Sequence, residues 1–194
     1  MPSLYVSTKN KDKLRELKEL LGEEVEVLHP APDDPDVDET GDTLFANALL
    51  KALEGFRRTG QLSIADDTGL EVDALDGAPG VFAARYAGEN ATYADNVNKL
   101  LHELRDADPA TMTARFRTVI CCIAEGQEPL RFDGVLEGRI IDTPRGENGF
   151  GYDPVFVPEN ETRTLAEMGA EEKNKISHRG RALRAFADWW RTQV

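Results

Sequence analysis

The chain has 194 residues, of which 40% are hydrophobic and 30% charged, and its formal net charge is −13. This composition is typical of a folded protein, and we expect one domain over residues 1–194. The acidity argues against nucleic acid as a partner, and the lack of an apolar run of about 20 residues argues against a membrane partner. No signal-peptide pattern opens the sequence, and the adjacent Cys121 and Cys122 match no zinc spacing, so we expect reduced thiols in a cytoplasmic protein.

The N-terminal part alternates strand and helix patterns. We predict a strand at residues 4–7, a helix capped by Asn10 or Asp12, and a second strand at residues 25–27. Residues 29–42 are rich in Pro and Asp, which predicts a loop. An amphipathic helix should follow, because four apolar residues recur at helical spacing: Phe45, Leu49, Ala52 and Phe56.

The rest of the chain continues this alternation. An apolar strand is predicted before Asp66, followed by a helix from about Tyr93 and two antiparallel strands at residues 115–124 and 130–141. After these come a Gly-rich loop at residues 146–151, a short strand at residues 155–157 and a last helix from near Ser177. The pattern predicts an α/β fold with a mixed β-sheet flanked by helices.

Asp66 and Asp67 are the most informative residues. They follow a short apolar run and precede Thr68-Gly69, where we predict a sharp turn at the end of the strand. Because adjacent like charges repel unless they share a cation or a proton, the pair indicates a divalent metal and metal-assisted hydrolysis. If the loop that carries Asp38 and Glu39 folds toward the pair, three or four carboxylates could hold Mg²⁺. The alternative is an Asp-Asp turn that faces water.

A basic segment at residues 7–13 leads into the first predicted helix. The N-terminus of a helix is a natural phosphate site, to which Thr8 and Asn10 could add donors and Lys13 a positive charge. In an acidic chain, such a segment suits a small polyanion such as a nucleoside triphosphate. The alternative is a solvated helix face.

A second basic segment spans residues 173–181. Ser177 is a good helix cap, which would place His178 and Arg179 in the first, exposed turn of the last helix, where both could donate to a ligand. A surface His-Arg pair without a function is the alternative.

Phe150 lies between Gly149 and Gly151, so it has little to pack against locally. An aromatic side chain on such a loop could be a stacking platform for a nucleobase. A Phe packed into the edge of the core is the equally open alternative.

Together these segments resemble the inosine triphosphate pyrophosphatase family, which hydrolyses deaminated purine nucleoside triphosphates. The match runs in order through nearly the whole chain, over Ser7-Thr8-Lys9-Asn10, Glu39-Thr40-Gly41-Asp42-Thr43, Asn47-Ala48, Ala65-Asp66-Asp67-Thr68-Gly69-Leu70, Gly77-Ala78-Pro79-Gly80-Val81, Ala84-Arg85-Tyr86, Phe150-Gly151-Tyr152-Asp153-Pro154 and Ser177-His178-Arg179-Gly180. The resemblance implies an elongated α/β fold with two lobes and a central cleft, a homodimer, and hydrolysis of ITP, dITP or XTP to the monophosphate and pyrophosphate.

By position, the resemblance implies that Asp67 is the general base and a Mg²⁺ ligand. Asp66 would lie in the same site, and Glu39, or Asp38 beside it, would be the second metal-binding carboxylate. The resemblance also implies contacts to the small-molecule triphosphate. Around the phosphates these are Thr8, Lys9, Asn10, Lys11, Asp12 and Lys13, and at the base they are Phe150, Gly151, Tyr152 and Asp153. Thr68 would touch the substrate, and Lys173, His178 and Arg179 would complete the nucleotide pocket.

The chain departs from the family pattern at two positions. Lys9 stands where most relatives have Gly, and Ala46 stands where relatives commonly carry Glu. Two other functions stay open at this stage: a pyrophosphatase for modified pyrimidine nucleotides, and a nucleotide-binding protein without catalytic activity.

Overall fold

The computed structural model describes residues 3–22 and 25–193. Its strands form one sheet in the order β2-β1-β3-β5-β6-β7, with β4 paired to β3. The strands are β1 (Ser3–Val6), β2 (Glu26–Leu28), β3 (Ser63–Val72), β4 (Pro79–Gly80), β5 (Thr113–Ile123), β6 (Leu130–Ile140) and β7 (Phe156–Pro158). The helices are α1 (Lys11–Leu21), α2 (Leu44–Thr59), α3 (Tyr93–Leu104), α4 (Ala170–Ile176) and α5 (His178–Trp190). The predicted fold class, α/β with a mixed sheet flanked by helices, is confirmed.

The chain folds into two compact units. The first unit comprises Met1–Asp67, Thr118–Gly134 and Arg179–Val194, and the second comprises Thr68–Arg117 and Val135–His178. In the part of the chain that the structure describes, none of the helices combines the length and the hydropathy needed to cross a bilayer.

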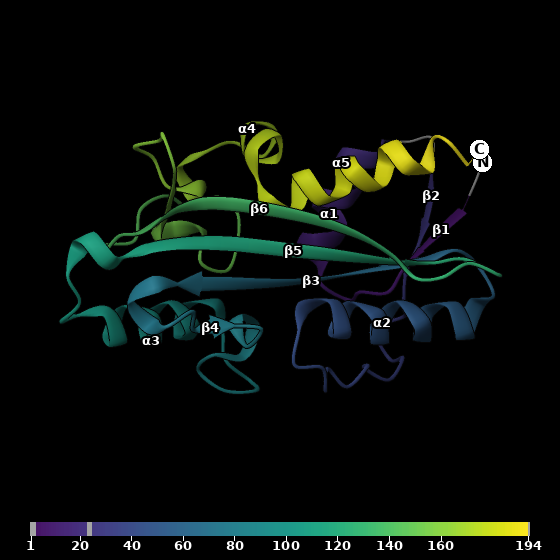
Figure 1. The fold of residues 1–194 in the computed structure, drawn as a ribbon, viewed down its shortest axis with the longest axis horizontal. Coiled ribbons are helices and arrows are strands. Elements are labelled where there is room, and N and C mark those ends of the chain that lie inside the picture. The colour runs from purple at the N-terminus through teal and green to yellow at the C-terminus, as the bar shows by residue number, and fades with distance from the viewer. Residues whose placement is uncertain (1–2, 23–24, 194) are drawn as a thin grey trace. The chain divides into compact units, whose positions relative to one another are not determined.

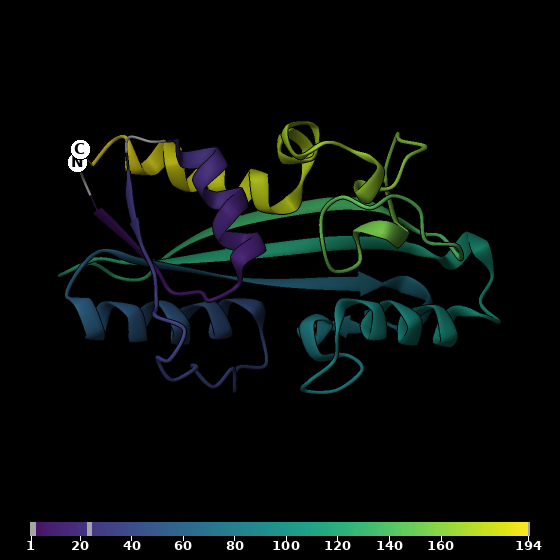
Figure 2. The same ribbon diagram turned by 180° about the vertical axis from the view of Figure 1, so that it is seen from behind.

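In the first unit, helices cover both faces of the sheet. β1 lies between β2 and β3 and is parallel to both. Figures 1 and 2 show α1 and α5 on one face and α2 on the opposite face. Side chains of β3 alternate between these two layers, because successive strand residues point to opposite faces. Ile64 packs with α1 and α5, whereas Ala65 packs with α2.

Local capping explains where the helices of the first unit begin. The Asn10 side chain accepts hydrogen bonds from the backbone N–H groups of Asp12 at 2.9 Å and Lys13 at 3.2 Å, so the predicted cap of α1 is confirmed. Thr43 caps α2 in the same way, by accepting from the backbone N–H of Ala46 at 3.1 Å. These caps fix the first turns of α1 and α2, which carry Lys13 and Asn47.

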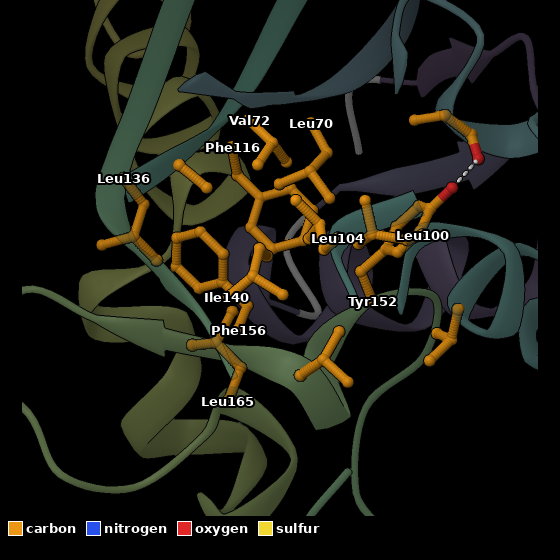
Figure 3. Close-up of a cluster of buried hydrophobic side chains, with 14 of the residues drawn as sticks. Leu70, Val72, Leu100, Leu104, Phe116, Leu136, Ile140, Tyr152, Phe156 and Leu165 are labelled. Carbon is orange, nitrogen blue, oxygen red and sulfur yellow. Dashed lines mark hydrogen bonds between the residues drawn. The ribbon is translucent and has the colours of Figure 1, made fainter. Parts of the chain in front are cut away.

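The second unit has its own apolar core, drawn in Figure 3. α3 lies on one face of its strands and α4 on the other (Figures 1 and 2). The core gathers Leu70 and Val72 of β3, Leu100 and Leu104 of α3, and Phe116, Leu136, Phe156 and Leu165. Tyr152 is part of this core, and its hydroxyl donates a hydrogen bond to the carbonyl oxygen of Ala83 at 2.8 Å, which satisfies the one polar group that the ring brings inside.

Two local predictions need correction. The predicted turn at Thr68-Gly69 is wrong, because β3 continues without a break to Val72. Leu70 and Val72 are fully buried on alternate positions, and this burial carries the strand through the glycine. The sequence reasoning also missed α4, a helix of seven residues with the acidic Glu171 and Glu172 in its first turn.

Candidate active site

Asp67 faces α2 and is held by two residues of that helix. The side-chain amide of Asn47 donates to Asp67 Oδ2 at 3.2 Å, and the ammonium of Lys51 lies 3.4 Å from Asp67 Oδ1. The same ammonium donates to Glu39 Oε1 at 2.5 Å. Lys51 therefore joins two of the predicted metal-binding carboxylates, Glu39 and Asp67.

Asn47 is oriented by the loop that precedes α2. Its Oδ1 accepts a hydrogen bond from the backbone N–H of Gly41 at 2.8 Å, so its amide nitrogen is left to donate to Asp67. A Cβ at position 41 would lie 2.6 Å from Ala46 Cβ and 2.8 Å from Asn47 Oδ1, which explains the glycine. The fully buried Asn47 thus links the Glu39 loop to Asp67.

Charges around Asp67 leave its carboxylate only partly compensated. Burial raises the pKa of Asp67, and the negative charge of the nearby Glu39 raises it further. Lys51, Lys13 and the Asn47 hydrogen bond lower it, but the net effect is a raised pKa. Burial alone would lower the pKa of Lys51, but Asp67 and Glu39 together raise it. Lys51 therefore stays charged, while Asp67 holds its proton more readily than an ordinary aspartate.

Asp66 faces the opposite layer and meets other partners. Lys13 of α1 lies 2.9 Å from Asp66 Oδ2, and Arg179 of α5 donates to the same oxygen at 3.4 Å. Arg179 also donates to Glu16 at 2.6 Å. All four side chains are largely buried, and their charges are connected in the order Lys13, Asp66, Arg179 and Glu16.

This network keeps Asp66 ionised. Burial would raise the pKa of Asp66, but Lys13, Arg179 and Lys51 outweigh burial and lower it far below its usual range. Burial lowers the pKa of Lys13, with Asp66 acting in the opposite direction. A cavity of about 10 Å³, lined by Thr8, Lys13, Asp66, Arg179 and apolar side chains, lies beside the network. It has room for roughly one water molecule.

The segment between β1 and α1 engages its polar groups in different ways. Thr8 Oγ1 accepts a hydrogen bond from the backbone N–H of Asn10 at 3.2 Å. The ammonium of Lys9 contacts the loop at residues 29–42. Lys11 is exposed, and Asp12 pairs with Arg15 at 3.0 Å. Of the predicted phosphate-binding residues, Lys13 lies in the charge network of Asp66.

In the second unit, Phe150 is half-buried and contacts two other side chains. The Lys173 ammonium lies 4.8 Å from the centre of the Phe150 ring, and the Tyr93 ring packs against Phe150 at 5.8 Å. Asp153 accepts from the Phe150 backbone N–H at 2.9 Å and from Lys173 at 2.8 Å. Gly149 has φ +72°, and a Cβ there would collide with Asp153, so the loop requires glycine.

His178 and Arg179 start α5, as predicted, but their predicted exposure is wrong. They are only 3% and 4% exposed, respectively. His178 stacks on Phe116, with ring centroids 4.5 Å apart and planes 13° apart. The buried carboxylates that pair with Arg179 explain why a charged side chain can lie inside. Thr68, beside Asp67, is half-buried within β3.

The predicted metal ligands divide between the two layers. Within residues 3–22 and 25–193, no group of three or more His, Cys, Asp or Glu side chains is gathered around a common point that could hold a metal ion. Asp67 and Glu39 lie on the α2 side and share Lys51, while Asp66 lies on the side of α1 and α5. Asp38 is exposed.

The sequence reasoning gave no role to three residues that complete these networks. Asn47 and Lys51 are four residues apart on α2, a spacing that puts both side chains on one helical face. Glu16 follows Lys13 by three residues, and both project toward the network of Asp66. Helical spacing from an already suspected residue is the signal that could have found Lys51 and Glu16.

The fold and these two buried carboxylates define an α/β protein with a polar, charge-lined site on each face of β3. The chain belongs to the Ham1 family, whose model matches residues 4–189. The resemblance predicted from the sequence is thereby confirmed.

Proteins of known name and structure agree with this assignment. A "dITP/XTP pyrophosphatase" of Bacillus licheniformis is 45% identical over 190 residues, covering 96% of this chain and 97% of that protein. One of the same name from Geobacter sulfurreducens is 47% identical over 191 residues, covering 97% of this chain and 96% of that protein. The structure of a HAM1 protein from Coxiella burnetii superposes with a TM-score of 0.90 at 42% identity and covers 100% of both chains.

Proposed function

We propose that this protein hydrolyses deaminated purine nucleoside triphosphates, such as ITP, dITP and XTP, to the monophosphate and pyrophosphate, and so clears deaminated purines from the nucleotide pool. The observation that carries the proposal is Asp67, a buried, oriented carboxylate with a raised pKa, as suits a general base. The names of the relatives support the substrate class. One family model over residues 4–189 supports a single pyrophosphatase domain along the chain.

Glu39 and Asp67 fit Mg²⁺ as their metal. Both are oxygen donors, and both already lie against one cationic group, the ammonium of Lys51. Mg²⁺ is commonly bound by one or two carboxylates together with substrate phosphates, so a cluster of three protein ligands is not required. When bound, Mg²⁺ would neutralise charge on the phosphate oxygens. Removal of metal with EDTA should abolish turnover, and added Mg²⁺ should restore it.

The chain's own residues supply the remaining chemistry. Asp67 accepts a proton from water as the water oxygen bonds to the α-phosphorus, the bond from phosphorus to the bridging oxygen breaks, and pyrophosphate leaves. Asn47 keeps the Asp67 carboxylate in one orientation. Lys51 and Lys13 are largely buried cations on the two faces of β3, and each can neutralise phosphate charge.

The second unit offers contacts suited to a purine base. Phe150 presents a ring that is already half-buried and backed by Tyr93, and Lys173 and Asp153 place a donor and an acceptor beside it. Hypoxanthine and xanthine carry an oxygen acceptor where adenine carries an amino donor. A site that donates to this oxygen leaves a buried donor unpaired when adenine binds, which costs about 1–3 kcal/mol.

The resemblance also implies a homodimer, and the cysteine usage favours the cytoplasm. Cys121 and Cys122 are free and buried, as expected in a reducing compartment. Burial raises the pKa of both thiols to about 12, so they are poor nucleophiles. Sedimentation of the purified protein tests the dimer, with a mass of about twice 21.5 kDa expected.

The deciding experiment is a panel of ITP, XTP, GTP, ATP and TTP with Mg²⁺, scored for pyrophosphate. We expect ITP and XTP to be cleaved with kcat/KM at least about tenfold above ATP, as one mismatched buried contact at the 6-position of the base would give. A preference for TTP would instead indicate a pyrimidine enzyme. Nucleotide binding without pyrophosphate release would indicate a nucleotide-binding protein without catalytic activity.

A further inference from the structure

Lys9 lies in the segment between β1 and α1, but its ammonium is directed to another loop. It contacts Asp36 Oδ1 at 2.9 Å, the carbonyl oxygen of Pro32 at 3.3 Å and the carbonyl oxygen of Asp34. The Lys9 side chain is 29% exposed. An ammonium has three donors and no acceptor, so these three oxygens match its full hydrogen-bonding capacity.

The loop that Lys9 contacts has a reason to need a cation. It carries four aspartates within six residues, Asp33, Asp34, Asp36 and Asp38, and like charges this close repel one another. Other contacts also order the loop. Its Ala31 backbone N–H donates to Asp34 Oδ2 at 2.8 Å, and Arg58 of α2 donates to the carbonyl oxygen of Pro35 at 3.3 Å.

The same loop leads directly to the Asp67 site. Three residues after Asp36 comes Glu39, which meets Lys51, and two residues later Gly41 donates to Asn47. Lys9 therefore ties the start of this loop to the segment after β1, while Asn47 and Lys51 tie its end to α2.

We propose that Lys9 is a positioning residue that clasps the loop at residues 29–42 and thereby holds Glu39 beside Lys51 and Asp67. Lys9 does not bind phosphate itself, because a phosphate contact would break one of its three existing bonds. The proposal deepens the proposed function, on which the role of Glu39 rests. It also gives a reason for a lysine at the position where the family pattern has glycine.

The test compares Lys9→Gln with wild type and with Lys18→Gln, a control that removes the same charge from an exposed position of α1. The first measurement is hydrogen–deuterium exchange of residues 30–42 in the ligand-free protein. We expect exchange about tenfold faster in K9Q, because a charge-assisted anchor is lost, and no change in K18Q. Unchanged exchange in K9Q would overturn the proposal.

The second measurement is the affinity for inorganic tripolyphosphate in EDTA, by calorimetry. A clasp predicts a Kd in K9Q within about twofold of wild type, since no phosphate contact is removed. A loss of about tenfold or more would identify Lys9 as a phosphate ligand and overturn the proposal, even if loop exchange rises. Neither measurement requires turnover, so a failed nucleotide panel and a failed clasp are distinguishable. If wild type does not bind tripolyphosphate, the exchange result alone decides.

Discussion

The two faces of β3 treat adjacent aspartates differently. Asp66 pairs with two cations, Lys13 and Arg179, and the pKa of its carboxyl is far below the usual range. Asp67 has a weaker ion pair, at 3.4 Å to a lysine that it shares with Glu39, and its pKa is raised. On the first face, two cations compensate the negative charge of Asp66. On the second face, the carboxylate of Asp67 is able to accept a proton.

The difference shows how one strand can place two adjacent carboxylates in different electrostatic environments. Successive strand residues point to opposite faces, so two carboxylates that are neighbours in sequence need not repel across one site. Each finds its own partners, Asp66 on α1 and α5 and Asp67 on α2. We therefore propose that Asp67 is the catalytic carboxylate and that Asp66 has a supporting role, in which it orders the charges of Lys13 and Arg179.

The largest effect should come from Asp67→Asn. It removes the base but keeps the shape of the side chain and one oxygen acceptor, which replaces one of the two contacts with Asn47 and Lys51. The fold should therefore persist while kcat for ITP falls by about a thousandfold. Pyrophosphate release measures the rate, and thermal unfolding is the control. Near-native turnover in D67N would remove Asp67 from its role.

Asp66→Asn should act chiefly on stability. It leaves two buried cations less compensated, at a cost of roughly 3–5 kcal/mol in the free energy of unfolding at pH 7, measured with urea. A lowered folded pKa gives stabilisation that is fully present above the unfolded pKa, about 4, and is lost as the pH falls toward the folded pKa. The difference between wild type and D66N should therefore shrink below about pH 4. A difference that is constant from pH 7 to pH 3 would contradict the assigned charge state.

Asn47→Ala should separate orientation from stability. The variant frees the Asp67 carboxylate to rotate, so we expect kcat/KM for ITP to fall roughly tenfold to a hundredfold. Asn96→Ala is the matched control, because Asn96 is also buried, accepts from Ala87 at 2.8 Å and donates to Ala84 at 3.1 Å in the second unit. Equal loss of activity in both variants would show a general stability effect.

The smallest effect should come from Phe150→Leu. Loss of a stacking ring should raise KM for ITP about tenfold and leave tripolyphosphate affinity unchanged, because only the base contact is altered. Phe82→Leu, at a ring that is 55% exposed, is the control. An unchanged KM in F150L would assign Phe150 to core packing, the alternative left open by the sequence.

The sequence predicted most of the fold because periodic apolar residues and caps are local signals. Asn10, for example, caps α1 as its position before the helix indicates. The turn at Thr68-Gly69 was wrong because β3 is continued by burial of Leu70 and Val72, which is a tertiary effect. Local patterns could not show this packing.

The site was less predictable for the same reason. Asp67 was singled out from sequence, but its partners Asn47 and Lys51 lie 20 and 16 residues away, and only the fold brings them to it. Arg179 was expected at the surface because charged residues usually lie there, yet distant Glu16 and Asp66 compensate it inside. The sequence does not distinguish Glu39 from Asp38 as the second metal-binding carboxylate, because the two are adjacent. The fold brings Glu39 to Lys51, the lysine that Asp67 also contacts.

The most direct test of the division between the two aspartates is a crystal structure with Mg²⁺ and a non-hydrolysable ITP analogue. We expect the ion on the carboxylates of Asp67 and Glu39, with Asp66 still paired to Lys13 and Arg179. An ion bound by Asp66, with Asp67 still held by Asn47 and Lys51, would contradict the account.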